Sequence, residues 1–165
     1  MTNASAGLGD ARVEVDLVGT WRLVRWDIAW PDGSRPPELP YGLDAEGLLV
    51  YTADGWMSGV VSRTNRAPLS IGTLRTAPES ERIAAFESYF HHAGRWALRM
   101  GPRGEPQVVH TVTQALNPGM VGTDQVRDVA FDDDGTLRLT GHERPRAGGT
   151  ARAHRLHWRR AGRAG

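Results

Sequence analysis

The sequence has 165 residues, of which 39% are hydrophobic and 24% are charged, and its formal net charge is +1 at pH 7. This length suits one domain with a buried core, and the composition argues against a disordered chain or a membrane span. A charge this close to neutral gives no strong field for nucleic acid, so we expect neither a nucleic-acid nor a membrane partner.

Two residue types are missing, and their absence limits the chemistry. The chain has no cysteine, which excludes disulfides, thiolate nucleophiles and cysteine-ligated metals. All 20 Lys/Arg positions are arginine, which excludes a lysine Schiff base and the lysine of a phosphate loop. No dinucleotide fingerprint and no closed set of His, Asp and Glu ligands is visible, so we expect no cofactor and no metal.

The two ends differ in composition from the rest of the chain. Residues 1–16 are small and polar and lack the basic and apolar segments of a signal peptide. They predict a flexible N-terminal arm on a cytoplasmic protein, and residues 161–165 predict a flexible tail. One domain is expected between them, at 17–160.

The first half of this domain predicts three β-strands. Residues 19–28 are rich in β-forming side chains and end at a Pro-Asp-Gly turn at 31–33. After a proline-rich connection at 36–40, residues 47–52 and 56–61 flank a short Asp-Gly turn, which predicts a β-hairpin.

One amphipathic helix is expected in the middle of the chain. Residues 76–79 have the spacing of a capping box, with a proline near the helix start. Apolar side chains recur at helical spacing from Ile83 to Phe90, which predicts a helix over about 79–92. Gly94 is expected to stop this helix.

Five further strand-like segments follow, at 96–100, 107–115, 125–131, 137–141 and 152–160. Eight strands joined mostly by hairpin-length loops indicate a barrel or sandwich, and a barrel of about eight strands leaves room for one small ligand. We therefore predict a single all-β domain, an eight-stranded antiparallel up-and-down barrel, with the helix acting as a lid.

Several sequence blocks, taken together and in order, resemble the bacterial and fungal lipocalin-like domain family within the wider calycin group. The resemblance covers about residues 17–160. A lone Gly-x-Trp would be weak, but this many blocks in the right order are specific. The blocks are LVGTWRL at 17–23, YG at 41–42, GLLVYTADGWMS at 47–58, GRW at 94–96, VVH at 108–110, VGTDQVR at 121–127 and LHWRR at 156–160.

The resemblance implies a barrel in which Trp21 closes one end and Arg160 packs over it, and a guanidinium does stack well on an indole face. The chain departs from the family at His92 and Ala93, where relatives carry aromatic residues, and at 117–120. Both departures are expected to alter the barrel mouth, so the ligand of a relative is not carried over.

Side chains alternate between the two faces of a strand, and this alternation sorts the later strands into interior and exterior positions. The first strand is apolar on both faces and is left unsorted. For the apolar candidates, plain core packing is the alternative interpretation, and for His110 and Arg127 it is a structural polar pair. The predicted ligand contacts are Tyr51, Met57, Phe86, Tyr89, Phe90, Trp96, His110, Gln125, Arg127 and His154.

Three functions fit this pattern. The first is a module that binds a small hydrophobic or aromatic molecule in the barrel. The second is a cofactor-independent cyclase, isomerase or dehydratase of a natural-product pathway, in which His110 shuttles a proton and Arg127 stabilises an oxyanion as the catalytic pair. The third is a filled barrel with a structural role. The sequence does not specify the ligand or the oligomeric state.

Overall fold

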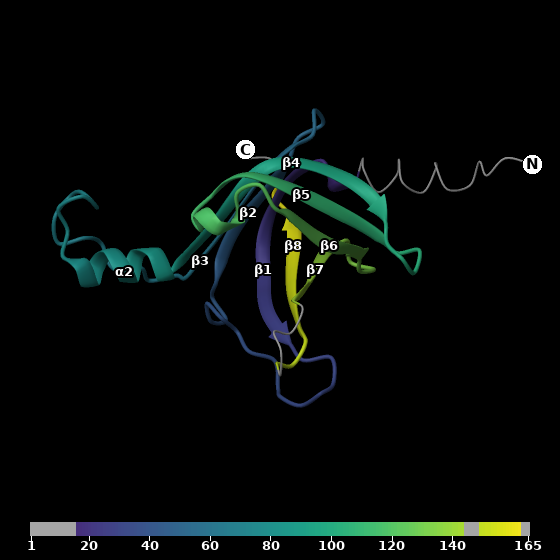
Figure 1. Cartoon of the computed structure of the whole chain (residues 1–165), viewed down its shortest axis with the longest axis horizontal. Helices are drawn as coiled ribbons and strands as arrows, with labels where there is room; N and C mark the ends of the chain where they lie inside the picture. Colours follow the sequence, from purple (N-terminus) through teal and green to yellow (C-terminus); the bar gives the residue numbers. More distant parts are fainter. Residues whose placement is uncertain (1–15, 144–148, 163–165) are drawn as a thin grey trace, which may run out of the picture.

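The computed structural model describes residues 16–143 and 149–162, and eight strands in it form one closed barrel (Figure 1). Each strand pairs antiparallel with the next, and the last pairs with the first, as predicted. Residues 1–15 of the predicted arm and residues 163–165 of the predicted tail lie outside the described residues. The strands are β1 Gly19–Ala29, β2 Glu46–Tyr51, β3 Trp56–Ser62, β4 Tyr89–Met100, β5 Pro106–Ala115, β6 Asp124–Phe131, β7 Leu137–Glu143 and β8 Arg152–Arg160.

The β2–β3 hairpin forms where the Asp-Gly turn predicted it. Gly55 has φ 84°, a left-handed conformation that glycine adopts without strain. The Thr52 hydroxyl accepts a hydrogen bond from the backbone N–H of Trp56 at 3.0 Å, which closes the turn. The conformation of Gly55 and the hydrogen bond of Thr52 therefore define the turn that joins β2 to β3.

The helix is shorter than predicted. Helix α2 covers Glu79–Glu87, and Tyr89 already begins β4. The expectation of helix over 79–92 was wrong beyond Glu87, because the aromatic side chains that follow fit a strand equally well. Pairing with β3, which places Tyr89 opposite Ser62, decides the conformation.

The predicted capping box is not formed. The residue before the helix is Pro78, and no side chain caps the helix. The Thr76 hydroxyl instead lies 2.8 Å from that of Thr73. Pro78 has φ −51° and ψ 147°, a non-helical conformation, and the helix begins after it without a capping side chain.

Helix α2 extends away from the barrel, on the connection between β3 and β4 (Figure 1). None of its residues is buried, and the side chains of Ile83 and Phe86 are 50% and 52% exposed. The helix therefore does not cover the barrel as a lid in this structure.

Two irregularities adjust the alternation of side chains along the strands. In β1 the register shifts between Leu23 and Arg25, so the side chains change face there. This shift explains why β1 is apolar on both faces. The register between β4 and β5 shifts beside Gly94, and the extra residue is Thr113 of β5; a β-carbon at Gly94 would collide with the carbonyl oxygen of Thr111.

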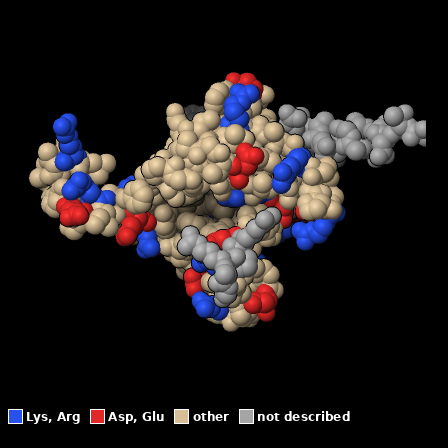
Figure 2. Space-filling model, in the orientation of Figure 1, with Lys and Arg blue, Asp and Glu red and all other residues tan. Residues whose placement is uncertain are grey.

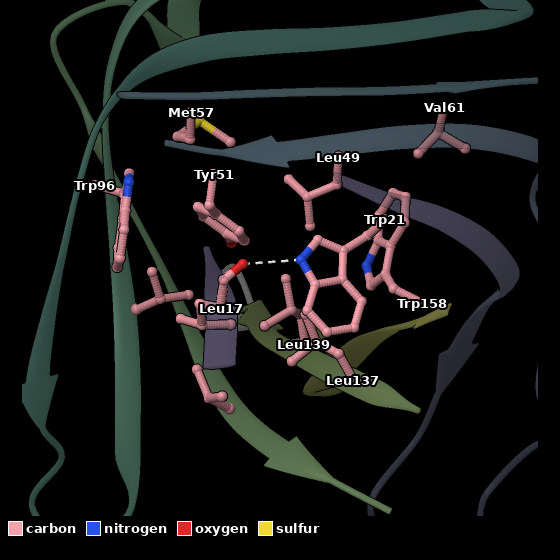
Figure 3. Close-up of a cluster of buried hydrophobic side chains, with 12 residues drawn as sticks. Leu17, Trp21, Leu49, Tyr51, Met57, Val61, Trp96, Leu137, Leu139 and Trp158 are labelled. Carbon is pink, nitrogen blue, oxygen red and sulfur yellow. Dashed lines mark hydrogen bonds between the residues drawn. The ribbon is translucent and has the colours of Figure 1, made fainter. Parts of the chain in front are cut away.

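An apolar cluster lies inside the barrel, and the part of it around Trp21 closes one end (Figure 3). The Trp21 indole N–H donates to the Leu17 carbonyl oxygen at 2.9 Å, and both side chains are buried. The Arg160 guanidinium lies 4.4 Å from the centre of the Trp21 ring and donates to the carbonyl oxygen of Val18. The closure that the resemblance implied is confirmed.

Acidic and basic side chains are interspersed over the face of the molecule seen in Figure 2. Neither sign is concentrated there, as a net charge near zero predicts. The described helices include none that is long and apolar enough to cross a membrane.

Candidate functional site

A cavity of about 560 Å³ occupies the opposite end of the barrel. Its walls come from the last part of β1, at Trp26, and from the first part of β4, at Phe90 and His92. The beginnings of β6 and β8 add Gln125 and His154. These strand ends all lie opposite the end that Trp21 closes.

Most of the cavity wall is apolar. The aromatic and aliphatic side chains in the wall are Trp26, Leu49, Val61, Phe90, Met120, Leu139, Leu156 and Trp158. The polar side chains are His92, His110, Asn117, Gln125, Arg127, His142, Glu143 and His154. Eight polar side chains thus share the wall with eight apolar ones, although apolar atoms make up most of its surface. Polar groups that converge on an apolar surface can orient a small molecule.

Three buried side chains form a hydrogen-bonded chain beside the cavity. The Tyr51 hydroxyl lies 2.7 Å from Nε2 of His110, and Nδ1 of His110 lies 3.0 Å from Nε2 of His92. Both ring nitrogens of His110 are therefore occupied by protein partners. In the described part of the chain, Nδ1 of His92 is buried with no partner.

Burial keeps all three members of this chain neutral. It lowers the pKa of His92 to about 4, and the charge of Arg127 adds to that effect. Burial, with His92 and Arg127 nearby, lowers the pKa of His110 well below 6.5. Burial also raises the pKa of the Tyr51 hydroxyl. At neutral pH the chain thus consists of a phenol and two uncharged imidazoles.

Arg127 brings the positive charge of the cavity wall. Its guanidinium donates to the Val126 carbonyl oxygen at 2.8 Å and to the Gln125 side-chain oxygen at 3.4 Å. Both acceptors are neutral, and none of the ion pairs within 16–143 and 149–162 includes Arg127. A β-carbon at Gly141 would lie 2.8 Å from this guanidinium, so glycine makes the space in which it lies.

A second polar group lies at the edge of the cavity. Glu143 accepts a hydrogen bond from Arg152 at 2.7 Å and lies 3.3 Å from Nε2 of His154. The bond from Arg152 lowers the pKa of Glu143. The negative charge of this carboxylate is therefore already matched by Arg152.

Five of the ten predicted ligand contacts line the cavity, namely Phe90, His110, Gln125, Arg127 and His154. Three others, Tyr51, Met57 and Trp96, point inward but pack in the apolar cluster at the closed end. Tyr89 lies at the start of β4 under the guanidinium of Arg66, and Phe86 is exposed on α2.

His92 is the main residue that the sequence interpretation missed. Placing it on a helix beside His91 hid the alternation of β4, in which the two histidines face opposite ways. His91 lies on the outer face, 3.1 Å from the Ser58 hydroxyl, whereas His92 faces the cavity. The sequence did contain one signal for His92, since this histidine stands where relatives carry an aromatic residue.

The described residues contain no group of three or more His, Cys, Asp or Glu side chains that could hold a metal ion. The cavity offers hydrogen bonding and charge: the guanidinium of Arg127, the neutral imidazoles of His92 and His110, and apolar surface. Such a set can bind and orient an organic molecule and can stabilise negative charge on an oxygen atom.

The closed eight-stranded barrel, plugged at one end and hollow at the other, is the architecture of ligand-binding barrels in general. Residues 18–161 match the family described as lipocalin-like domain, so the chain belongs to this family. No curated protein matches the chain at a significant level.

Proposed function

We propose that this protein binds one small, largely apolar molecule inside the open end of its barrel. The observation that carries the proposal is the cavity of about 560 Å³, since a filled barrel would leave no such space. That volume is within the usual range, roughly 300–1,000 Å³, of sites for small molecules.

The wall accounts for the apolar part of the ligand. Val61 and Leu139 form part of the cavity wall and are only 3% exposed each. Trp26, Phe90 and Trp158 add aromatic surface, which favours flat or aromatic ligands. Burying apolar ligand surface here yields roughly 25 cal/mol per Å² before the cost of ordering the ligand.

Filling the cavity tests the proposal. Val61 faces the cavity, whereas its neighbour Val60 is on the other face of β3. With pyrene-1-methanol as a neutral probe, we expect binding to the wild type, seen as quenching of tryptophan emission. Val61→Trp should weaken binding at least tenfold, and the matched control Val60→Trp should not. Equal binding by all three proteins would contradict the proposal.

A cofactor-independent cyclase, isomerase or dehydratase is the second candidate. The chain Tyr51–His110–His92 favours it, because a hydrogen-bonded imidazole at a cavity wall can exchange a proton with a substrate while Arg127 stabilises an oxyanion. His92 is better placed for this role than His110, whose two ring nitrogens are occupied. Turnover lost in His92→Gln with ligand binding retained would favour the enzyme.

A further inference from the structure

The described part of the chain has three buried side-chain nitrogens without a hydrogen-bond partner. All three belong to residues that line the cavity, but the nitrogen atoms themselves are shielded from it. They are Nε1 of Trp26, Nε1 of Trp158 and Nδ1 of His92. An indole nitrogen can only donate a hydrogen bond. Two of the three unpaired groups are therefore donors whatever the state of the histidine.

The hydrogen-bonded chain decides the role of His92. If the Tyr51 hydroxyl donates to His110, then His110 donates to His92, and the remaining proton of His92 is on Nδ1. If the chain runs the other way, Nδ1 of His92 is an unpaired acceptor and the buried Tyr51 O–H also lacks an acceptor. The first direction leaves one unpaired group and the second leaves two. Since an unpaired buried group is costly, the first direction is favoured.

Arg127 is the side chain of the cavity wall that offers a positive charge to a bound molecule. Arg127 adds a guanidinium that the described residues pair only with two neutral oxygens. Among the other groups facing the cavity, His92 and His110 are neutral, and the Glu143 carboxylate is bonded to Arg152. One positive charge is left for which a bound molecule can supply the partner.

We propose that the ligand is an organic anion of the carboxylate, phenolate or enolate class, with its charged oxygen on Arg127. This assignment rests on the proposed binding function and specifies the ligand chemistry. A guanidinium presents two parallel N–H groups, which suit the two oxygens of a carboxylate or of a β-dicarbonyl enolate. The apolar remainder of the molecule lies against Val61, Phe90 and Leu139.

A series of three probes that differ only in charge tests the assignment: pyrene-1-carboxylate, pyrene-1-methanol and pyrene-1-methylammonium. The wild type should bind the carboxylate at least tenfold more tightly than the alcohol, and the ammonium compound most weakly. In Arg127→Met the carboxylate should lose its advantage and bind like the alcohol. Arg138→Met removes an arginine that pairs with Asp132 outside the cavity, and it should behave as the wild type.

The outcomes separate the two proposals. If the wild type binds the alcohol as tightly as the carboxylate, the anion assignment is overturned and the binding function stands. If the folded wild type binds none of the three probes, the binding function fails and the assignment fails with it. Should Arg127→Met not fold, Arg127→Gln provides the same comparison, because it removes the charge and keeps a polar side chain.

Discussion

The two ends of the barrel use the same strands for opposite purposes. At the closed end, Trp21, Tyr51 and Leu137 are 1% exposed or less and pack without a cavity. At the open end, His92, Arg127 and their neighbours surround a cavity and leave buried donors unpaired. The difference indicates that the closed end stabilises the fold, while the open end is less completely packed, as the proposed binding site requires.

The largest effect is expected from breaking the closed end. Trp21→Ala removes a buried indole and its bond to Leu17, and should lower the free energy of unfolding by about 3–5 kcal/mol. Trp26→Ala is the matched change at the open end, and should cost under about 2 kcal/mol because this side chain faces a cavity. Urea unfolding followed by circular dichroism checks both, and equal losses would contradict the division of roles.

The open end should make stability depend on pH. The pKa of His92 is lowered from 6.5 to about 4 in the folded protein, so the unfolded chain takes up a proton first as the pH falls. The stabilisation from His92 is complete above pH 6.5 and is lost progressively toward pH 4, by about 3 kcal/mol in total.

Urea unfolding of the wild type and of His92→Gln at a series of pH values isolates this contribution. The wild type should lose more stability than the variant between pH 6.5 and pH 5. Parallel curves would show that His92 is not held neutral by burial.

Gly141→Ala is expected to alter binding more than stability. Its new methyl group would meet the Arg127 guanidinium at 2.8 Å, which is the movable end of a long side chain. We expect a loss of about 1 kcal/mol or less in stability, and at least a fivefold loss in affinity for pyrene-1-carboxylate. Calorimetric titration measures the affinity, and an unchanged value would show that Arg127 does not hold the anion.

The smallest effect is expected on α2, which contributes to neither end. Phe86→Ser should change stability by less than about 0.5 kcal/mol, because the side chain is half exposed and no helix residue is buried. Phe90→Ser, which alters the cavity wall, should weaken probe binding, whereas Phe86→Ser should not. Weakened binding in Phe86→Ser would instead show that the helix closes over the ligand.

Local signals in the sequence predicted most of the fold. The Asp-Gly turn at residues 54–55 predicted a hairpin, and the blocks around Trp21 and Arg160 identified the closure of the barrel. The end of α2 could not be predicted, because Tyr89 and Phe90 satisfy both a helical and an alternating pattern. Only pairing with β3, a contact distant in the sequence, separates the two.

The candidate site was predicted less completely, for a geometric reason. Alternation tells which face of a strand a side chain occupies, but not its height along the barrel axis, which depends on the stagger of the strands. Tyr51 and Trp96 were thus placed inside correctly, yet they pack at the closed end. His110 and Arg127 were predicted because β5 and β6 pair in a regular register there, whereas His92 was assigned to a helix and its alternation with Trp96 along β4 was not applied.

The pairing of β1 with β8 has a consequence for how the chain reaches its native state. Trp21 lies opposite Arg160, so nearly the whole domain intervenes between two strands that must meet. Closing so long a loop is entropically costly and slows folding. During synthesis β1 can pair with β2 early, but its other edge stays open, with the Trp21 indole uncovered by Arg160, until the ribosome has released β8.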